Sequence, residues 1–465
     1  MFIGRERELK ELEKLYQTEK FQFAVIYGRR RVGKTALINE FIREKEAIYF
    51  TGVETNEKQN LENFSSSVMN FELGRDVNSA FYSFQDALEH VFKLSVDKRI
   101  ILVIDEYPYV ARASRSLAST LQLLIDKYKE NSKMFLILCG SSMSYMEDHV
   151  LAYKAPLYGR RTAQFKIQPF TFKEVCKYFP EMHPENQALI YGVVGGTPQY
   201  LLQMDAGLSI EDNIKNTFLN PISSLFEEPV NLLKQEVREP AIYNAIISAV
   251  AGGASKMSEI SSKVGEESSL CATYMKNLID LGIVKKETPY GEDTTRKTIY
   301  CVADNMFRFW YRFVPTNHAL IARGAVDVAY KRIETELSDY MGMVFEEICK
   351  QYLWKQLLDG KGAVLFTDIG RFWGTNAQTK KQVEIDIMGT ADKDTALFAE
   401  CKWRNEKVDA GILEKLIEKS EMFHYKHKYY YLFAKAGFTT GCIERAEELG
   451  NVSLVSFRDI VQSHT

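Results

Sequence analysis

Four apolar runs of strand length occur in the first third of the chain. They lie at residues 21–27, 47–51, 100–104 and 134–138. Strands that are apolar at successive positions are typical of a parallel sheet covered on both faces. Residues 36–45 predict a helix between two of these runs, and a helical region at 186–203 is interrupted by Gly195–Pro198. The pattern predicts an α/β domain with a helical lid over residues 1–235.

The pattern changes after residue 235. Helical periodicity at 241–250, 257–264 and 269–281 is followed by two short strand-like segments, 282–286 and 298–302, around the turn-rich stretch 289–295. Three helices and a two-stranded wing describe a winged helix-turn-helix domain over residues 236–313. Residues 314–323 are expected to be a connector. A long helix at 333–358, followed by further strands, predicts a third α/β domain over residues 324–465.

The strongest chemical motif directly follows the first predicted strand. Residues 28–35 read GRRRVGKT, which matches the phosphate-binding P-loop. Gly28 and Gly33 permit the turn, Lys34 is expected to reach the β- and γ-phosphates, and the Thr35 hydroxyl to hold Mg²⁺. We expect the arginine side chains to point away from the phosphates. The nucleotide-contacting residues of this segment are then Gly28, Arg29, Arg30, Arg31, Val32, Gly33, Lys34, Thr35 and Ala36.

Acidic residues at the end of the third apolar run complete this prediction. Asp105 is expected to bind Mg²⁺, and Glu106 to orient and deprotonate the attacking water. Ser141, after the fourth run, is a candidate γ-phosphate sensor, with a helix N-cap as the alternative. Arg160 and Arg161 are candidates for a charge-stabilising finger, with a solvated basic pair as the alternative.

A second candidate site lies near the C-terminus, in two strand-like segments around the predicted turn 391–394. Alternation places Glu384 and Asp386 on one face of the first strand. It places Glu400 and Lys402 on one face of the second. A hairpin would therefore bring Asp386, Glu400 and Lys402 together. Two carboxylates suit Mg²⁺ or Mn²⁺, Lys402 would position the water, and Glu346 on the preceding helix is the candidate third carboxylate. The alternatives are a hairpin with solvent-facing charges and a catalytically inactive nuclease fold.

The predicted winged helix gives a weaker signal for DNA. Its recognition helix presents Thr273, Lys276 and Asn277, with only one basic side chain, whereas DNA-reading helices usually carry more positive charge. The wing carries more basic side chains, namely Lys285, Lys286, Arg296 and Lys297. A structural lid against the nucleotide is the favoured alternative, and the aromatic residues at 307–313 are expected to be core.

Composition narrows the range of functions. A chain of 465 residues suggests about three domains. The net charge of −3 excludes a global basic field, so any nucleic-acid surface must be local. The seven cysteines form no CxxC motif, which favours reduced thiols over a zinc site. The charged N-terminal segment lacks a signal-peptide core and no run is long enough to span a bilayer, so we expect a cytoplasmic protein without a membrane partner.

Two further motifs make a family resemblance specific. Residues 2–9, FIGREREL in sequence, resemble the hydrophobic-Gly-Arg-Glu box that precedes the P-loop in AAA+ and STAND ATPases. Residues 195–198, GGTP, are similar to the Gly-x-Pro element of STAND proteins. The resemblance places Gly4, Arg5 and Pro198 at the nucleotide and implies ATP. No Asn-Lys-x-Asp motif of GTPases occurs. The order of motifs over the full chain resembles the archaeal-type ATPase family.

The C-terminal motif resembles the PD-(D/E)XK nuclease fold, in its Holliday-junction-resolvase-like branch, although Ile385 stands where the proline of that name would be. The combined interpretation is a Mg²⁺-dependent ATPase that switches a nuclease-like domain acting on DNA, with self-association into a homo-oligomer left open. One alternative is an ATP/ADP signalling switch that acts through protein contacts, with an inactive nuclease-like fold. Another is a transcription regulator that reads DNA through the winged helix. The single basic side chain on the recognition helix makes this alternative weaker.

Overall fold

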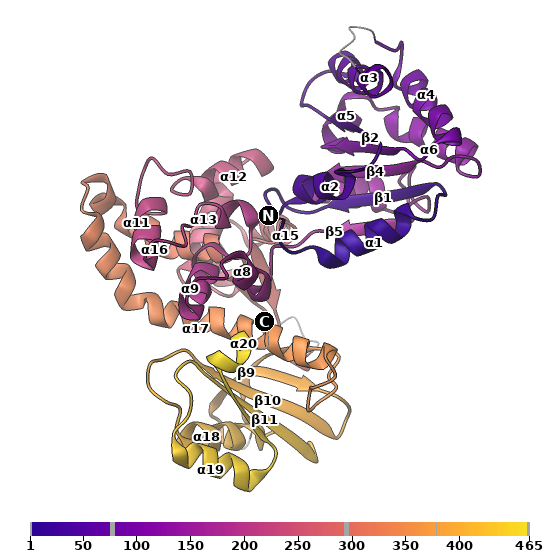
Figure 1. The fold of residues 1–465 in the computed structure, drawn as a ribbon. Helices are drawn as coiled ribbons and strands as arrows, with labels where there is room; N and C mark the ends of the chain where they lie inside the picture. Colours follow the sequence, from indigo (N-terminus) through magenta and orange to yellow (C-terminus); the bar gives the residue numbers. More distant parts are fainter. Residues whose placement is uncertain (1, 75–79, 293–296, 378, 463–465) are drawn as a thin grey trace. The chain divides into compact units, whose positions relative to one another are not determined.

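The computed structural model describes residues 2–74, 80–292, 297–377 and 379–462. The chain divides into two compact units (Figure 1). The first comprises the residues up to Phe170 together with Thr197–Gln199, and the second comprises Thr171–Gly196 and the residues from Tyr200 onward. Residues 171–196 and 200–235, which the sequence assigned to the ATPase domain, thus lie in the second unit. Among the residues described, no helix is long and apolar enough to cross a membrane.

The first unit is a five-stranded parallel sheet with helices on both faces. The strands run in the order β2-β3-β4-β1-β5, and the prediction of a parallel sheet is confirmed. The strands are β1 (Gln22–Tyr27), β2 (Ala47–Thr51), β3 (Ile101–Asp105), β4 (Phe135–Gly140) and β5 (Ala163–Lys166). The helices are α1 (Glu6–Tyr16), α2 (Lys34–Ile42), α3 (Glu57–Leu73), α4 (Phe84–Asp97), α5 (Tyr107–Ala113), α6 (Leu117–Tyr128) and α7 (Met143–Met146), with a π-helical turn at Glu147–Leu151.

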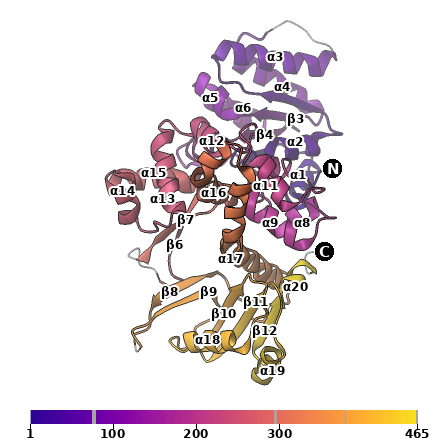
Figure 2. The same ribbon diagram turned by 90° about the vertical axis from the view of Figure 1, so that its left-hand side faces the viewer.

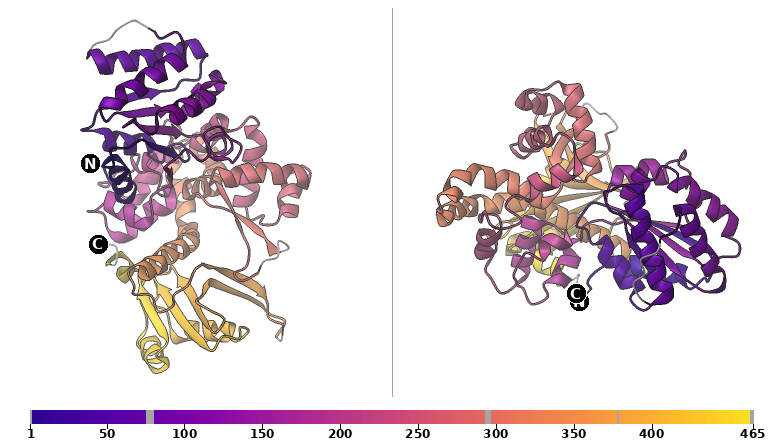
Figure 3. Two further views of the ribbon diagram at one scale, coloured as in Figure 1. Left: turned by 90° about the vertical axis from the view of Figure 1, so that its right-hand side faces the viewer. Right: turned by 90° about the horizontal axis from the view of Figure 1, so that it is seen from above.

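Two apolar cores explain why the central strands are apolar at every position. Every residue of β1, β3 and β4 is buried. Side chains such as Phe23, Leu102 and Leu136 pack against α3, α4 and α6 on one face. Their neighbours Ala24, Val103 and Ile137 pack against α1 and α2 on the other. The sheet lies between these two layers of helices (Figures 1 and 3). Because the strands are parallel, the loops after β1, β3 and β4 meet at one edge of the sheet.

The second unit begins with helices and a two-stranded antiparallel sheet. The helices are α8 (Phe172–Tyr178), α9 (Pro184–Val194), α10 (Pro198–Leu201), α11 (Ile210–Thr217), α12 (Glu228–Glu236), α13 (Pro240–Ala251), α14 (Met257–Val264), α15 (Ser268–Asp280) and α16 (Asn305–Ala322). Helix α10 straddles the boundary between the units. Strands β6 (Val284–Glu287) and β7 (Ile299–Val302) form the small sheet. Helices α13, α14 and α15 and the two-stranded sheet correspond to the three helices and the wing of the predicted winged-helix domain.

Helix α16 corrects the predicted connector at residues 314–323. It continues through Pro315, and its aromatic side chains Phe307, Phe309 and Phe313 are buried. The helix packs on α9 and α17. Burial of this aromatic face outweighs the hydrogen bond that proline cannot donate. The expectation that these aromatic residues form core is confirmed.

The C-terminal part of the second unit is a mixed five-stranded sheet in the order β12-β11-β10-β9-β8. Strands β8, β9 and β10 are antiparallel, whereas β10, β11 and β12 are parallel. Helix α17 packs on one face of the sheet, and α18 and α19 lie on the other (Figure 2). The elements are α17 (Val326–Leu358), β8 (Ile369–Thr375), β9 (Gln382–Thr390), β10 (Thr395–Lys402), α18 (Ala410–Ser420), β11 (His427–Ala434), α19 (Thr440–Leu449), β12 (Val452–Ser456) and α20 (Phe457–Gln462). The predicted β9–β10 hairpin is confirmed.

Candidate active site

The P-loop connects β1 to α2, as the sequence predicts. A Cβ atom added to Gly28 would lie 2.4 Å from the carbonyl oxygen of Ile167, so this position requires glycine. Gly33 has a φ of +90° and caps the N-terminus of α2. The buried Lys34 ammonium group donates to the carbonyl oxygens of Gly28, at 2.9 Å, and Arg29, at 3.0 Å. Burial lowers the pKa of Lys34, although the Cys139 thiol and the Glu106 and Asp105 carboxyls oppose this effect.

Asp105 lies at the end of β3, next to the P-loop threonine. Its Oδ2 atom accepts hydrogen bonds from Thr35 Oγ1, at 3.0 Å, and from the Tyr49 hydroxyl, at 2.6 Å. Its Oδ1 atom accepts one from the Glu106 backbone N–H, at 2.9 Å. Burial and the Asp105 charge raise the pKa of Tyr49, so this hydroxyl remains a donor. A hydroxyl and a carboxylate side by side are oxygen ligands of the type Mg²⁺ takes, and the pair fits the ion that the sequence predicts.

Glu106 follows Asp105 and meets a residue from the next loop. Its backbone adopts a φ of +49°, an uncommon conformation for a residue other than glycine. Its Oε2 atom accepts a hydrogen bond from Ser141 Oγ at 2.8 Å. Ser141 directly follows β4 and is buried. The sequence named Ser141 as a candidate phosphate sensor; the structure places its hydroxyl on the candidate base.

The N-terminal box and the 197–199 segment both reach the P-loop. Arg5 Nη2 donates to the carbonyl oxygens of Val32, at 3.0 Å, and Gln168, at 2.5 Å. Gly4, beside it, is buried. Arg29 Nη2 donates to Thr197 Oγ1 at 3.0 Å, and a Cβ atom added to Gly33 would lie 3.6 Å from Pro198 Cγ. These contacts bring together residues that the family resemblance assigned to the nucleotide.

The other basic candidates have protein partners. Arg30 Nη2 donates to the Tyr109 hydroxyl at 2.8 Å. Arg160 makes two hydrogen bonds to the Asp126 carboxylate on α6, at 3.0 and 2.6 Å. The Arg161 guanidinium lies 5.7 Å from the centre of the Tyr158 ring. The finger role of Arg160 and Arg161 therefore stays a prediction, and for Arg160 it would require breaking a bidentate ion pair.

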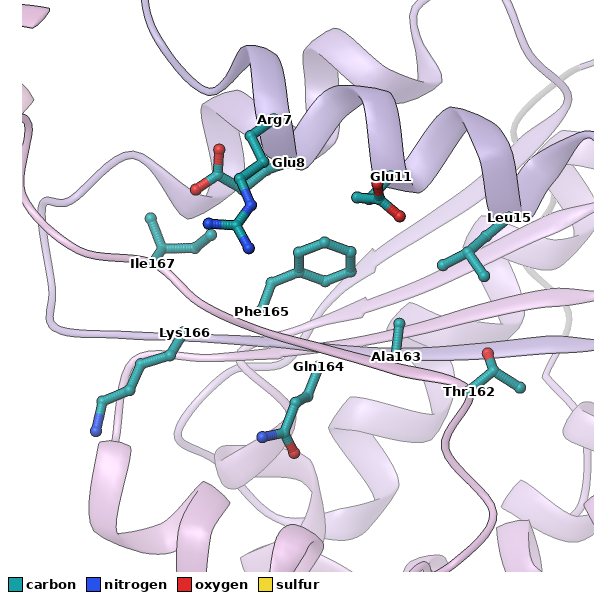
Figure 4. Close-up of a pocket in the computed structure, with 10 residues that line it drawn as sticks. All are labelled: Arg7, Glu8, Glu11, Leu15, Thr162, Ala163, Gln164, Phe165, Lys166 and Ile167. Carbon is teal, nitrogen blue, oxygen red and sulfur yellow. The ribbon is translucent and has the colours of Figure 1, made fainter. Parts of the chain in front are cut away.

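A cavity of about 520 Å³ lies elsewhere in the first unit, between α1 and the edge strand β5 (Figure 4). The Phe165 ring lies beneath α1, and Arg7 extends toward it from the helix. The side chains of Gln164 and Lys166 extend away from α1. Residues 28–35 do not line this cavity, so it is separate from the phosphate-binding loop.

The C-terminal carboxylates approach one another on β9 and β10. The ladder between these strands ends at the pair Ile387 and Ala399, and Asp386 and Glu400 come next on each strand. Burial raises the pKa of Asp386, and the nearby Glu400 charge raises it further. Glu346, on α17, has a pKa raised to about 7 by burial and by Asp386. The Glu400 charge thus acts on Asp386, and the Asp386 charge acts on Glu346.

Lysines meet Glu400 at both oxygens. Lys402 Nζ lies 2.6 Å from its Oε1 atom, and Lys419 Nζ on α18 lies 2.9 Å from Oε2. Asp386 Oδ2 accepts a hydrogen bond from the Cys401 N–H at 2.8 Å. Throughout the described ranges, no group of three or more His, Cys, Asp or Glu side chains is arranged to hold a metal ion. The donor types suit a divalent cation, but as arranged here the predicted set of Glu346, Asp386 and Glu400 does not fit one.

Of the residues predicted to face DNA, those on the recognition helix are exposed, whereas two lysines of the wing are paired with glutamates. Thr273, Lys276 and Asn277 are exposed, as expected, although the Asn277 amide donates to the Tyr243 hydroxyl at 2.6 Å. Lys285 Nζ is paired with Glu287 at 2.6 Å, and Lys297 Nζ with Glu292 at 2.6 Å. Arg296 lies outside the described residues. The wing thus carries less uncompensated positive charge than its sequence suggests.

The comparisons with known proteins agree with the ATP-site geometry. Residues 2–204 match the model of an ATPase domain predominantly from Archaea, and residues 310–413 match that of archaeal and bacterial proteins of unknown function. The uncharacterized protein MJECL04 of Methanocaldococcus jannaschii is 33% identical over 88% of both chains. The uncharacterized ATP-binding protein MJ0423 of the same organism is 46% identical over 46 residues, which are 10% of this chain and 78% of that protein.

A solved structure shows the same fold. The Walker-type ATPase PABY2304 of Pyrococcus abyssi superimposes with a TM-score of 0.51 at 20% identity, over 67% of this chain and 96% of that one. The protein described here is therefore a P-loop ATPase with a C-terminal mixed-sheet domain. It belongs to the archaeal-type ATPase family that includes MJECL04.

Two residues of these sites gave no signal in the sequence. Tyr49 is one of the alternating positions of β2, and only its pairing with Asp105 reveals its place. Lys419 is one of two lysines on α18, which carries no motif. Neither residue has a fixed spacing from the motif it joins, so the tertiary structure was needed to find them.

Tyr49→Phe is expected to lower ATP turnover about three- to tenfold while leaving ATP affinity nearly unchanged. The variant loses a hydrogen bond to a charged group, worth roughly 1.5–3 kcal/mol, that holds Asp105 against Thr35. Lys34 and the loop remain to bind the phosphates. Tyr128→Phe is the matched control, because it also removes a tyrosine–carboxylate hydrogen bond, to Glu89 at 2.7 Å. Steady-state kinetics and calorimetry measure both quantities; equal turnover in Tyr49→Phe and the control would contradict a positioning role.

Proposed function

We propose that the protein hydrolyses ATP with Mg²⁺ and that this reaction controls a C-terminal nuclease-like domain acting on DNA. The observation that carries the ATPase proposal is the convergence of three loops at one edge of the parallel sheet. Thr35 from the P-loop meets Asp105, and Ser141 meets Glu106. A nucleotide site needs this combination of a phosphate cradle, metal ligands and a base.

The roles follow from the chemistry of each side chain. Lys34 donates to the β- and γ-phosphate oxygens in place of its present carbonyl partners. Thr35 and Asp105 hold Mg²⁺, which supplies positive charge against the phosphates when bound. Glu106 accepts the proton of the water whose oxygen attacks the γ-phosphorus, and the bond to the β–γ bridging oxygen breaks. Ser141 fixes the orientation of the Glu106 carboxylate through its hydroxyl.

The nuclease-like proposal rests on the order of elements and on the hairpin. The order α17-β8-β9-β10-α18-β11 places a helix before a three-stranded meander and another helix after it. Asp386 and Glu400 lie directly beyond Ile387 and Ala399, the last pair of the β9–β10 ladder, and Lys402 lies beside Glu400. These features support the resemblance to PD-(D/E)XK nucleases that the sequence indicates. DNA as the partner rests on the resemblance to nucleases and not on the winged-helix elements, whose lysines Lys285 and Lys297 are paired with glutamates. Self-association is left to experiment.

One observation favours a second candidate function. Both oxygens of Glu400 are paired with lysines, and the carboxylates do not form a group that holds a metal in the arrangement described. An ATP-dependent switch with a catalytically inactive nuclease-like fold would have such a site. All seven cysteines carry free thiols, which supports the cytoplasm as the proposed location for either function.

DNA cleavage separates the two candidates. We expect the purified protein with Mn²⁺ or Mg²⁺ to cleave branched, single-stranded or duplex DNA, with a rate that ATP alters. Asp386→Ala is expected to reduce cleavage by more than about 100-fold, because a half-buried carboxylate proposed to hold the metal is removed. Asp392→Ala, in the exposed turn of the same hairpin, is the matched control. Absence of cleavage from all three substrates, with ATP turnover intact, would replace the nuclease proposal by the switch.

A further inference from the structure

Strand β5 forms one edge of the parallel sheet in the first unit. Among the strands described, it is paired with β1 alone. The strand has four residues, of which Gln164 and Lys166 are exposed. An edge strand presents backbone N–H and C=O groups on its outer side, and these groups pair readily with a strand from another chain. Strand β5 is therefore a candidate interaction surface.

The orientation of β1 decides which backbone groups of β5 lie on the outer side. The Gln22 N–H group donates to the carbonyl oxygen of Met134, directly before β4, at 2.9 Å. Successive residues of a strand direct their N–H and C=O groups to opposite sides. Since Gln22 faces β4, the backbone groups of Val25 and Tyr27 face β5.

The register between β1 and β5 then identifies the outer groups. Val25 is paired with Gln164, and Tyr27 with Lys166. In a parallel pair, a residue bonds to the two neighbours of its register partner and not to the partner itself. Accordingly, the Ile167 N–H group donates to the Tyr27 carbonyl oxygen at 2.7 Å. The N–H and C=O groups of Gln164 and Lys166 therefore point away from β1.

The cavity between α1 and β5 lies beside this edge, on the face that carries Phe165 (Figure 4). Its volume of about 520 Å³ gives room for a further aromatic side chain next to the half-buried Phe165 ring. Two basic and two acidic side chains line it: Arg7, Lys166, Glu8 and Glu11. Because these charges balance, the cavity does not favour a nucleic acid or another strongly charged partner. It suits a partner with the same balance of charges.

We infer that β5 pairs with β5 of a second copy of this chain, antiparallel and centred on Phe165. In this register, Gln164 of each copy lies opposite Lys166 of the other, and their outer N–H and C=O groups exchange four hydrogen bonds across a two-fold axis. The two Phe165 residues form the central non-hydrogen-bonded pair, in which side chains lie closest. Both rings lie on the α1 face, so each one fills the cavity of the other copy.

Other antiparallel registers of two β5 strands are less favourable. Centring the pair on Lys166 would place the two lysines directly opposite each other, and like charges in this position are destabilising. Centring it on Gln164 would place Lys166 opposite Thr162, whose N–H group already donates to the Phe23 carbonyl oxygen at 2.8 Å. Only the register centred on Phe165 uses the outer groups of both residues and sets each lysine opposite a neutral side chain.

The first test measures the oligomeric state of the full-length protein by sedimentation equilibrium over a range of concentrations. We expect a monomer–dimer equilibrium. Gln164→Pro removes one outer N–H group per copy but keeps the bonds to β1, and the loss of two of the four hydrogen bonds is expected to weaken the dimer about tenfold. Ala47→Pro, at the first residue of β2 on the opposite edge of the sheet, is the matched control and should dimerise normally.

The second test determines the register by disulfide formation. Residues opposite each other in a non-hydrogen-bonded pair have Cα atoms about 4.5 Å apart, which is within the range of a disulfide. Phe165→Cys is therefore expected to form a disulfide with its copy on oxidation with copper–phenanthroline, and mass spectrometry identifies the linked peptide. Gln164→Cys is the control, because its two cysteines would lie two positions out of register and too far apart to bridge.

Both results are required. A monomer at every concentration overturns the inference, and so does a dimer that Gln164→Pro leaves as strong as Ala47→Pro does. A dimer whose Phe165→Cys variant forms no more of the linked peptide than Gln164→Cys also overturns it. If thermal melting shows that Gln164→Pro does not fold, Phe165→Lys takes its place, since it sets like charges opposite each other. The proposed ATPase and nuclease functions do not involve the outer edge of β5, so they stand or fall separately.

Discussion

Lys34→Ala is expected to abolish measurable ATP binding. Lys34 places its ammonium group 2.9 and 3.0 Å from two carbonyl oxygens of the phosphate-binding loop, so the cation is already held at the loop. Alanine removes this charge, and Mg²⁺ and the backbone N–H groups must then neutralise the triphosphate without it. Hydrogen bonds to charged groups contribute about 1.5–3 kcal/mol each, and more than one phosphate oxygen would lose its partner. We expect affinity to fall by at least about 100-fold.

Calorimetry with ATP and Mg²⁺ measures this effect. Lys45→Ala is the matched control, because Lys45 lies just beyond the C-terminal end of the same helix and pairs with Glu13 at 3.1 Å. Thermal melting of both variants shows whether the fold is kept. Unchanged ATP affinity in Lys34→Ala would refute the P-loop assignment. Since burial lowers the pKa of Lys34, ATP affinity should also decline as the pH rises, and at lower pH than an ordinary lysine would produce.

The strands and the phosphate site could be predicted from sequence because each leaves a local pattern. The runs at 47–51, 100–104 and 134–138 match β2, β3 and β4 to within two residues. A parallel sheet buried on both faces leaves no polar positions in its central strands, and a P-loop requires fixed spacing between glycine, lysine and threonine. Both constraints act along a few consecutive residues.

The differences arise where contacts between distant segments decide the structure. Residues 314–323 are predicted to be a connector, but α16 continues to Ala322, and its aromatic face is buried. Residues 171–196 follow the ATPase sheet in sequence and yet pack with α16 and α17. Lys419 contacts Glu400 although the two residues are 19 positions apart. No sequence motif fixes that spacing, so the contact could not be predicted. Alternation predicts that Asp386 and Glu400 come together, and the two residues lie just beyond the last pair of the β9–β10 ladder. It gives no information on which cations neutralise Glu400.

The candidate base gives the second large expected effect: Glu106→Gln should bind ATP normally and hydrolyse it about 10²–10⁴-fold more slowly. The amide keeps the size of the side chain and can still accept the hydrogen bond from Ser141 Oγ, which is 2.8 Å long in the structure. It cannot accept a proton from water at neutral pH. Binding is expected to survive because Lys34, Thr35 and Asp105 are unchanged.

Glu57→Gln provides a closely matched control for this substitution. Glu57 also accepts a serine hydrogen bond, from Ser114 at 2.6 Å, in the same unit but outside the P-loop. Single-turnover hydrolysis and ATP affinity are measured for both variants. Turnover in Glu106→Gln equal to that of Glu57→Gln would show that another group activates the water. Ser141→Ala then distinguishes orientation from chemistry: if Ser141 only orients the base, its loss slows hydrolysis less than Glu106→Gln and adds little when the two substitutions are combined, because both act on the same carboxylate.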